Sequence, residues 1–406
     1  MIHATNFTDS TNHSIRISEI RVTESSRASV QPFELLRETM PPFRHEEFVR
    51  PDIATMEPYV PIVPFEVLSA RLGRRPEEIV KLDANENPYG PSPEVLVALA
   101  EAKYLHIYPD PQSSALCRAL ADYTGVPQGH LLAGAGADEL IDLVLRAVLR
   151  PGDGVLNCPP SFGMYPFSTA VNMGELIQVW RRDDFALDLD GIRTAVSANP
   201  RARILFICSP NNPDGSVISD DALRQLLEMR VLVILDEAYV EFGGESRITW
   251  TLQYENLVVL RTFSKWAGLA GLRVGYGAFP RWLMPHLWKI KQPYNVSVAA
   301  SQAAIAALHD AAWSRRHVDA IVAERNRLFE ALAELEFLEP LPSRANFVLC
   351  RIVGADAARL KRDLEQQGIL VRYFDKPGLQ NYIRISAGRP QDTDRLLTAL
   401  SSWEGS

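Results

Sequence analysis

Lys265 stands directly after an apolar run and is followed by small apolar residues in the stretch TFSKWAGLAGLRVGY, residues 262–276. Burial among apolar groups disfavours the charged ammonium and exposes the lone pair of the amine. A lysine in this setting is suited to covalent bonding with a carbonyl carbon, which a solvated lysine does not require. Ser264 and Arg273 lie in the same stretch, and a hydroxyl and a guanidinium can together bind a phosphate group. The stretch therefore predicts a reactive amine beside an anion site.

Three more polar side chains follow predicted strands. Asn212 lies in SPNNPDG after the strand RILFIC, and Asp236 and Tyr239 lie in ILDEAYVEF. Asp236 interrupts an apolar run, where a carboxylate is costly unless it is paired. Considered singly, SPNNPDG is typical of a turn and Tyr239 of a core aromatic residue. Their coincidence with Lys265 favours a common ligand.

Two further motifs add a phosphate-binding backbone and an aromatic ring. GAGADEL, residues 134–140, places glycines before a predicted helix, whose N-terminus offers free N–H groups to a phosphate. An ordinary tight turn is an equally good interpretation, and the GxG lacks the third glycine of a dinucleotide fingerprint. Phe162, in CPPSFGMY, could stack on a planar ligand or simply belong to the core.

Together these groups meet the requirements of pyridoxal phosphate. Its aldehyde needs an amine, and its ring nitrogen needs a carboxylate that keeps the ring protonated. Its 3-oxygen needs neutral donors, its phosphate needs N–H groups and a guanidinium, and its ring face needs an aromatic side chain. The sequence therefore predicts this cofactor and no metal, since the eight histidines form no ligand motif.

The elements that position these residues alternate between helices and short apolar strands from about residue 112. The strands GVLNC, RILFIC, VLVILD and NLVVLRT are typical of a parallel sheet covered on both faces. Such an open α/β sheet binds its ligand beyond the carboxyl ends of the strands. The C-terminal part mixes helices and strands as expected for a smaller α+β domain.

We expect four segments. They are a poorly ordered arm (1–55), a segment packing with the small domain (56–84), a large cofactor-binding domain (85–300) and a small C-terminal domain (301–406).

The composition excludes several classes of protein. With 42 basic and 50 acidic residues, the formal charge of −8 argues against a nucleic-acid partner. No apolar run reaches the ~18 residues that a membrane helix needs. The four scattered cysteines are expected to be buried thiols, which predicts a cytoplasmic protein.

The chain resembles the fold-type I aminotransferases, and among them the histidinol-phosphate aminotransferases, especially the plant-type sequences. The resemblance rests on PYVPIVPFEVLSARLG, KLDANENPYGPSP, IYPDPQ, GAGADELIDL, CPPSFGMY, SPNNPDGS, LDEAYVEF, RTFSKWAGLAGLRVGYGAFP, KQPYNVSVAA, SRANFVLCRI and YIRISAG, across roughly residues 56–400. It implies a large domain whose mostly parallel sheet lies between helix layers, plus a smaller α+β domain. It also implies a homodimer with shared active sites.

The resemblance assigns a role to each site residue. Lys265 would bond to the cofactor aldehyde and later move the proton of the substrate, and Asp236 would pair with the ring nitrogen. The cofactor contacts would be Ala137, Asp138, Phe162, Asn212, Asp236, Tyr239, Ser264, Lys265, Arg273 and, from the partner subunit, Tyr108. The substrate contacts would be Tyr59, Asn346, Arg372 and Arg384.

The implied reaction is reversible transfer of an amino group between glutamate and imidazole acetol phosphate, in histidine biosynthesis. Aromatic amino-acid transamination and decarboxylation of a phosphorylated amino acid remain alternatives, and so does a regulator that has lost catalysis. Two departures from the family pattern stand out. Asp214 replaces the threonine of most aminotransferases in this class, although the plant-type sequences look the same. Trp266 replaces the arginine of those sequences and is expected to alter the entrance of the site.

Overall fold

The computed structural model describes residues 43–58 and 63–404. Most of the expected N-terminal arm and the predicted substrate residue Tyr59 therefore lie outside the described residues. The chain divides after Met56 into two units. The described part of the first unit holds a short 3-10 helix, η1 (His45–Glu47), and a single helical turn, α2 (Pro51–Ala54), and its described side chains are exposed or only partly buried.

The larger sheet of the second unit has seven strands in the order β2-β8-β7-β6-β5-β3-β4. Their bounds are β2 Leu131–Gly134, β3 Gly154–Asn157, β4 Glu175–Gln178, β5 Ala202–Cys208, β6 Leu232–Asp236, β7 Leu257–Thr262 and β8 Gly275–Ala278. The strands from β7 to β4 are parallel, and β8 is antiparallel to both of its neighbours. The four strands predicted from apolar runs are β3, β5, β6 and β7.

The α-helices around this sheet alternate with its strands from β2 to β6, whereas 3-10 helices lie between β6, β7 and β8. The α-helices are α4 Pro93–Ala100, α5 Ser114–Thr124, α6 Ala137–Val148, α7 Met164–Val171, α8 Leu189–Ala198, α9 Asp220–Leu227, α10 Met284–Ile290 and α11 Val298–His309. Short 3-10 helices lie between them at η3 Gln128–His130, η4 Val240–Phe242, η5 Ile248–Leu252 and η6 Ala270–Leu272. Two helix ends have capping residues of the usual kinds. The Ser219 side chain accepts from the Ala222 N–H at the start of α9, and α5 ends at Gly125 in the left-handed region.

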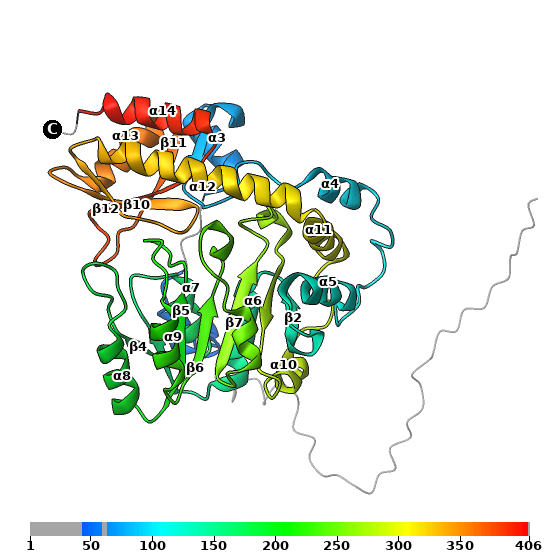
Figure 1. Ribbon diagram of the computed structural model, residues 1–406. Helices are drawn as coiled ribbons and strands as arrows, with labels where there is room; N and C mark the ends of the chain where they lie inside the picture. The colour runs from blue at the N-terminus through cyan, green and yellow to red at the C-terminus, as the bar shows by residue number, and fades with distance from the viewer. Residues whose placement is uncertain (1–42, 59–62, 405–406) are drawn as a thin grey trace, which may run out of the picture. The chain divides into compact units, whose positions relative to one another are not determined.

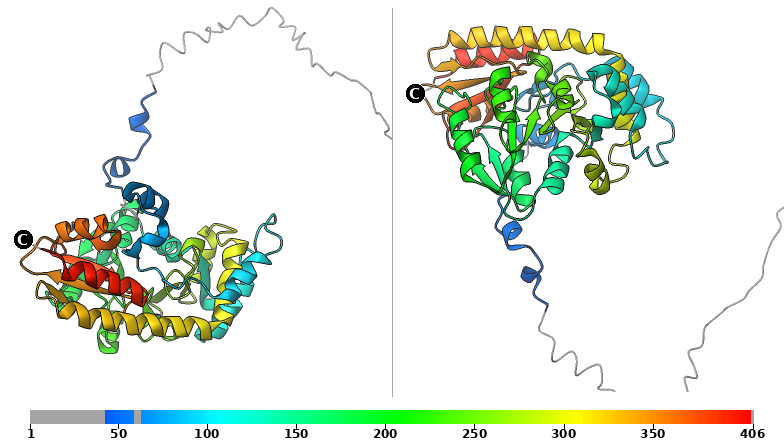
Figure 2. Two further views of the ribbon diagram at one scale, coloured as in Figure 1. Left: turned by 90° about the horizontal axis from the view of Figure 1, so that it is seen from above. Right: turned by 60° about the horizontal axis from the view of Figure 1, so that its bottom comes forward.

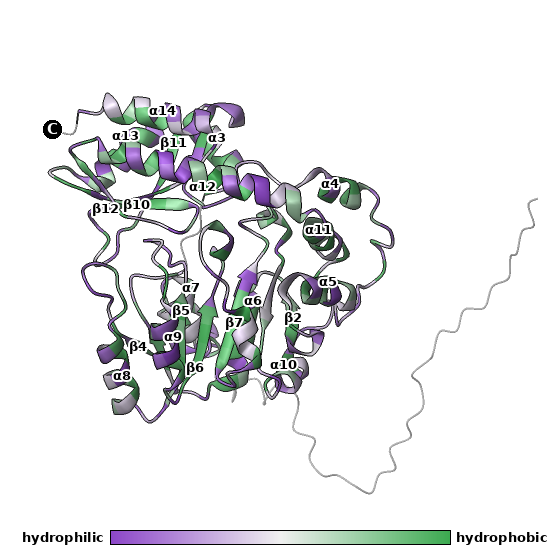
Figure 3. Cartoon of the chain, in the orientation of Figure 1, coloured by the Kyte–Doolittle hydropathy of each residue, from purple (hydrophilic) through white to green (hydrophobic). Residues whose placement is uncertain are grey.

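Successive residues of the central strands enter two different cores, because side chains alternate along a strand. On β6, Val233 and Leu235 belong to one core with residues of α5, α8, α9 and α11. Leu232 and Ile234 belong to the other core with residues of α6, α7 and α10. The sheet is therefore covered by helices on both faces, which explains why its strands are apolar throughout, as the hydrophobic colour of β6 shows (Figure 3).

A second sheet contains five strands in the order β1-β11-β12-β10-β9. Their bounds are β1 Val80–Leu82, β9 Leu338–Pro340, β10 Phe347–Ile352, β11 Ile369–Tyr373 and β12 Tyr382–Ser386. The associated helices are α3 Phe65–Leu72, η2 Pro76–Glu78, α12 Ala311–Ala333, α13 Ala357–Gln366 and α14 Pro390–Ser401. The early strand β1 pairs in parallel with β11, so a segment near the start of the second unit joins the C-terminal sheet.

Apolar side chains of α12, α13 and α14 share one core with this smaller sheet. The 23-residue helix α12 extends from α11 across to the smaller sheet, where α14 lies beside it (Figures 1 and 2). The predicted fold class is confirmed. It is an α/β fold with a mostly parallel sheet between helix layers and a smaller α+β part.

Other observations concern the described residues only. All four cysteines are buried and free of disulfides, as the sequence predicted. Within residues 43–58 and 63–404, no helix is both long and apolar enough to cross a membrane. The same residues contain no cluster of three or more His, Cys, Asp or Glu side chains arranged to hold a metal ion.

Candidate active site

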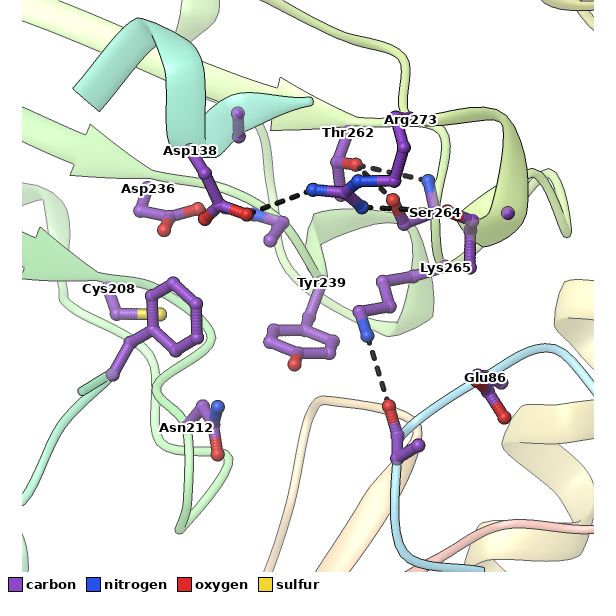
Figure 4. A pocket seen from close by; sticks show the side chains of 16 residues that line it. Glu86, Asp138, Cys208, Asn212, Asp236, Tyr239, Thr262, Ser264, Lys265 and Arg273 are labelled. Atoms are coloured by element: carbon purple, nitrogen blue, oxygen red, sulfur yellow. Dashed lines mark hydrogen bonds and ion pairs between the residues drawn. The ribbon is translucent and has the colours of Figure 1, made fainter. Parts of the chain in front are cut away.

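A cavity of about 380 Å³ lies where strands β5, β6 and β7 end (Figure 4). Nine of the predicted site residues line it, namely Ala137, Asp138, Phe162, Asn212, Asp236, Tyr239, Ser264, Lys265 and Arg273. They come together because the carboxyl ends of neighbouring parallel strands lie at one edge of the sheet. The remaining wall includes Ala84 and Glu86, which belong to the segment after β1.

Lys265 lies in the turn that follows β7, and its ammonium faces the cavity. Its Nζ donates a hydrogen bond to the carbonyl oxygen of Ala84 at 3.1 Å and lies 5.7 Å from the centre of the Tyr239 ring. Burial lowers the pKa of Lys265 to about 8 from an ordinary value of 10.5, and the positive charge of Arg384 acts in the same direction. A larger fraction of this amine is therefore neutral near pH 7 than for a solvated lysine.

Asp236 is the last residue of β6, and only 3% of its surface is exposed. Its Oδ2 accepts from the Tyr165 hydroxyl at 2.7 Å, and its Oδ1 accepts from the Ala238 N–H at 3.0 Å. Burial raises the pKa of Asp236 to about 6, and these two hydrogen bonds oppose that effect. Among the described residues, no basic side chain forms an ion pair with this carboxylate. A cation that entered the cavity would therefore stabilise its ionised form.

Tyr239 presents its phenol to the cavity from the turn after β6. Its hydroxyl oxygen accepts from the side-chain amide of Asn85 at 3.1 Å, and burial raises the pKa of Tyr239 to about 12. Asn85 is itself held by the smaller sheet. The backbone N–H of Asn85 donates to the Ser386 hydroxyl, which donates to Asn85 Oδ1, and both distances are 2.9 Å. The side-chain amide of Asn346 donates to the carbonyl oxygen of Asn85 at 3.0 Å.

The phosphate-binding end is built around the first turn of α6. Gly136 precedes this helix with a φ of +84°, and a Cβ atom there would lie 2.8 Å from Nη2 of Arg273. Arg273 donates from Nη2 to Asp138 Oδ2 at 3.0 Å. The Ser264 N–H donates to the Thr262 hydroxyl at 3.0 Å, which donates to Ser264 Oγ at 2.9 Å. An anion bound here would share the Arg273 guanidinium with Asp138.

Four described residues of the predicted site do not line the cavity. Arg384, 5% exposed, donates to Asn212 Oδ1 at 2.6 Å and to the Asp83 carbonyl oxygen at 2.7 Å, so it adjoins the cavity wall. Asn346 is fully buried and donates a hydrogen bond to Asn85, which in turn contacts the cavity residue Tyr239. Arg372 lies on β11, and its guanidinium is 5.5 Å from the centre of the Phe374 ring. Tyr108 is 79% exposed and stacks on Tyr294, with ring centres 4.6 Å apart.

The expectation for Trp266 is corrected by its burial. This residue is 2% exposed, does not line the cavity, and packs against Tyr123 and Phe263 in the core. Trp266 contributes its backbone instead, since its carbonyl oxygen accepts from Asn87 at 2.9 Å.

Sequence reasoning missed three residues of the site. Thr262 closes strand β7 and lines the cavity next to Ser264. Tyr165 is fully buried on α7 and supports Asp236 from behind, and Asn85 binds Tyr239. The available signals were weak. Tyr165 follows Phe162 by three residues, and Asn85 belongs to the ANENPYG motif, yet neither position indicates its partner.

The residues present fit pyridoxal phosphate. A buried carboxylate without a cationic partner among the described residues suits a pyridinium nitrogen, and an amine of lowered pKa suits the aldehyde. The glycine before α6 leaves room for the Arg273 guanidinium beside free backbone N–H groups. The fold and this site together define a pyridoxal-phosphate-dependent transferase.

Comparisons with known proteins agree with that class. The family described as "Aminotransferase class I and II" matches residues 77–400. A histidinol-phosphate aminotransferase of Nicotiana plumbaginifolia, named as chloroplastic, is 54% identical over 360 residues, which cover 88% of this chain and 87% of the relative. The enzyme of the same name from Roseiflexus castenholzii is 51% identical over 87% of this chain and 97% of the relative.

A solved structure gives the same result. The histidinol-phosphate aminotransferase of Sinorhizobium meliloti, in complex with pyridoxal-5'-phosphate, superposes with a TM-score of 0.79 at 30% identity, over 87% of this chain and 96% of that one. The chain belongs to the class I and II aminotransferases and, within them, to the histidinol-phosphate aminotransferase family.

Proposed function

We propose that this chain catalyses the reversible transfer of an amino group between glutamate and imidazole acetol phosphate, giving 2-oxoglutarate and histidinol phosphate for histidine biosynthesis. The observation that carries the proposal is the cavity in which a lysine of lowered pKa and a buried carboxylate face the same space. The 54% identity to a histidinol-phosphate aminotransferase over most of both chains supports the choice of substrate.

When bound, pyridoxal phosphate supplies an aldehyde for covalent attachment and a protonated ring that withdraws electrons from the substrate. We assign Lys265 Nζ to the covalent attachment. Once the amine is free again, it would be the base that moves the proton between the substrate Cα and the C4′ carbon of the cofactor, as its lowered pKa allows. The Ala84 carbonyl oxygen orients this amine, since it already accepts from Nζ.

The other cavity residues hold and orient the cofactor. The side chains of Asp236, Asn212, Tyr239 and Phe162 all line the cavity. Asp236 would receive the ring N–H, Asn212 and Tyr239 would contact the 3-oxygen, and Phe162 would cover one face of the ring. The N–H groups of Ala137 and Asp138, with the side chains of Ser264 and Arg273, surround the phosphate. These assignments place donors and acceptors opposite complementary groups of the ligand.

Two arginines are proposed to bind the acidic groups of the substrates. Arg384 presents two N–H groups, which contact Asn212 and the Asp83 carbonyl oxygen in this structure. Arg372 lies directly opposite Arg384 in the register of the antiparallel strands β11 and β12. A planar guanidinium can bind either a carboxylate or a phosphate in a bidentate manner, which suits a site that accepts both substrates. Asn346 and Tyr59 complete the proposed substrate contacts.

The substrate is tested with purified protein, 2-oxoglutarate as acceptor, and histidinol phosphate or phenylalanine as donor. We expect a higher kcat/KM for histidinol phosphate and no turnover by Lys265→Ala. Borohydride should fix the cofactor to the wild-type protein but not to this variant. A preference for phenylalanine would replace the first proposal with aromatic amino-acid transamination. Release of carbon dioxide from a phosphorylated amino acid, offered as a separate substrate without 2-oxoglutarate, would indicate a decarboxylase.

We further propose a homodimer whose two sites each receive Tyr108 from the partner subunit. The exposed phenol of Tyr108 lies outside the cavity of its own chain, and the neighbouring Leu105 and Ile107 are exposed apolar side chains. Mixing inactive Lys265→Ala and Tyr108→Ala chains should restore part of the activity, because one hybrid site has both wild-type residues. Absence of any recovery in verified hybrid dimers would contradict a shared site.

The proposed location is the cytoplasm, for which the four free buried thiols are the support. Fractionation of the source cells with detection of the full chain would test it, and recovery in an organelle would contradict it. We retain a large domain over residues 85–300, a small domain over 301–406, and residues 56–84 packed with the small domain. The pairing of β1 with β11 supports that last assignment.

A further inference from the structure

Tyr165 lies outside the cavity wall but touches its most buried acidic group. The side chain is fully buried on α7, and its hydroxyl donates to Asp236 Oδ2 at 2.7 Å. The ring is fixed on two sides. It stacks on Phe206 with ring centres 4.5 Å apart and planes 6° apart, and it meets the edge of Phe162 at 5.5 Å and 83°. This packing leaves the hydroxyl little freedom to move away from Asp236.

The direction of the hydrogen bond is determined by protonation. Burial and the negative charge of Asp236 raise the pKa of the Tyr165 phenol well above its ordinary value, so the phenol keeps its proton and can only donate to the carboxylate. The one other donor to Asp236 among the described side chains and backbone is the Ala238 N–H. Tyr165 therefore supplies half of the hydrogen bonds that hold a carboxylate with no ion-pair partner in the described residues.

We propose that Tyr165 is a positioning residue, whose hydroxyl keeps the Asp236 carboxylate ionised and in one orientation to receive the ring N–H of the cofactor. This inference rests on the proposed role of Asp236. It adds a residue outside the cavity to the groups that determine how tightly the cofactor binds and at which pH. Phe162 both lines the cavity and contacts the Tyr165 ring. The same packing therefore holds the Tyr165 hydroxyl and Phe162, the residue proposed to stack on the cofactor ring.

The effect of removing the hydroxyl has a defined sign. Burial already raises the pKa of Asp236 to about 6, and the Tyr165 hydrogen bond lowers it. Losing this bond raises the pKa further, so a larger fraction of Asp236 is protonated near pH 7. Loss of a buried hydrogen bond to a charged group changes an equilibrium roughly 10- to 100-fold. Because a 10- to 100-fold change in this equilibrium is a rise of about one to two pKa units, Tyr165→Phe should weaken cofactor binding about 2- to 10-fold at pH 7.

The test uses cofactor-free full-length protein and measures the Kd of pyridoxal phosphate from pH 5.5 to 8.5 by absorbance. Tyr276→Phe is the matched control, because Tyr276 is also fully buried but its hydroxyl has no hydrogen-bond partner among the described residues. We expect Tyr276→Phe to follow the wild type. For Tyr165→Phe, the pH at which affinity declines should move up by about one to two units.

Two further variants separate the possible outcomes. Tyr165→3-fluorotyrosine keeps the hydroxyl and the packing but is a stronger donor, so the decline should move to lower pH. If both Tyr165 variants match Tyr276→Phe, the inference is wrong. If Asp236→Asn greatly weakens binding while Tyr165→Phe does not, only the role of Tyr165 is overturned. If Asp236→Asn leaves the Kd and its pH profile unchanged, the role of Asp236 is overturned as well.

Discussion

Replacing Asn85 by alanine should strongly destabilise the protein, although Asn85 is only one residue of a turn. Its side chain joins the Tyr239 phenol to the Ser386 hydroxyl, and both hydroxyl groups are buried. Asn85 also adopts a φ of +56°, in the left-handed region that asparagine and glycine tolerate better than alanine. The substitution therefore removes two hydrogen bonds and introduces backbone strain.

The expected magnitude follows from these contacts. A buried polar group that loses its partner costs about 1–3 kcal/mol, and two such groups remain after the substitution, which gives roughly 2–6 kcal/mol. The left-handed conformation adds about 1 kcal/mol for alanine. Asn85→Gly removes the same two side-chain hydrogen bonds but avoids that strain. The glycine variant should therefore be more stable than the alanine variant by about 1 kcal/mol, apart from the flexibility that glycine adds to the unfolded chain.

The assay is urea-induced unfolding of cofactor-free protein, followed by far-ultraviolet circular dichroism. A loss of less than about 1 kcal/mol for Asn85→Ala would refute the reasoning, because a single net hydrogen bond already contributes that much. Asn85→Asp is the informative companion. It keeps the size and the backbone preference, but an ionised carboxylate cannot donate to Tyr239, and the phenol would donate to it instead. The absorbance of bound cofactor should change in this variant because the Tyr239 phenol would then donate to the new carboxylate and no longer to the 3-oxygen of the cofactor, its proposed partner.

Three other outcomes are expected. In cofactor-free protein, the reaction of the Lys265 amine with trinitrobenzenesulfonate should rise with pH about a midpoint near 8, since deprotonation exposes the nucleophile; a midpoint near 10.5 would contradict the burial effect. Gly275→Ala should lower the free energy of unfolding by about 1–3 kcal/mol and weaken phosphate binding, because the new Cβ would lie 2.7 Å from the Ala137 nitrogen. Gly129→Ala is the control, since a Cβ there meets open space, and it should match the wild type in unfolding and cofactor titrations. Arg384→Lys should raise KM for both substrates about 10-fold, because lysine cannot make the bidentate contact, and an unchanged KM in steady-state assays would argue against its substrate role.

Much of the cavity was predictable because its residues follow strands. Asp236 ends β6, and Asn212 and Lys265 lie in the turns beyond the ends of β5 and β7, which are parallel neighbours of β6. Once a parallel sheet is predicted, the turns after its strands must lie at one edge. Residues that are distant in sequence, such as Asn212 and Lys265, can thus be placed near each other from the chain pattern alone.

The supporting residues required the tertiary structure. Asn85 contacts Tyr239, 154 positions away, and Ser386, 301 positions away. Those contacts depend on how β1 pairs with β11 in the smaller sheet, and an antiparallel or parallel register between distant strands is not encoded by either strand alone. Tyr165 likewise has the sequence setting of any core aromatic residue.

The amino-acid sequence by itself determined the alternation of helices and buried strands, the lysine in a turn after an apolar strand, and the side chains that follow the neighbouring strands. Local chemistry and periodicity are sufficient for these, because they depend on neighbouring residues. The tertiary structure decided that Trp266 faces the core, that Tyr165 supports Asp236, and that the smaller sheet holds Asn85 against Tyr239. Such contacts depend on the packing of several elements at once, since a side chain acquires its partners only when distant segments meet.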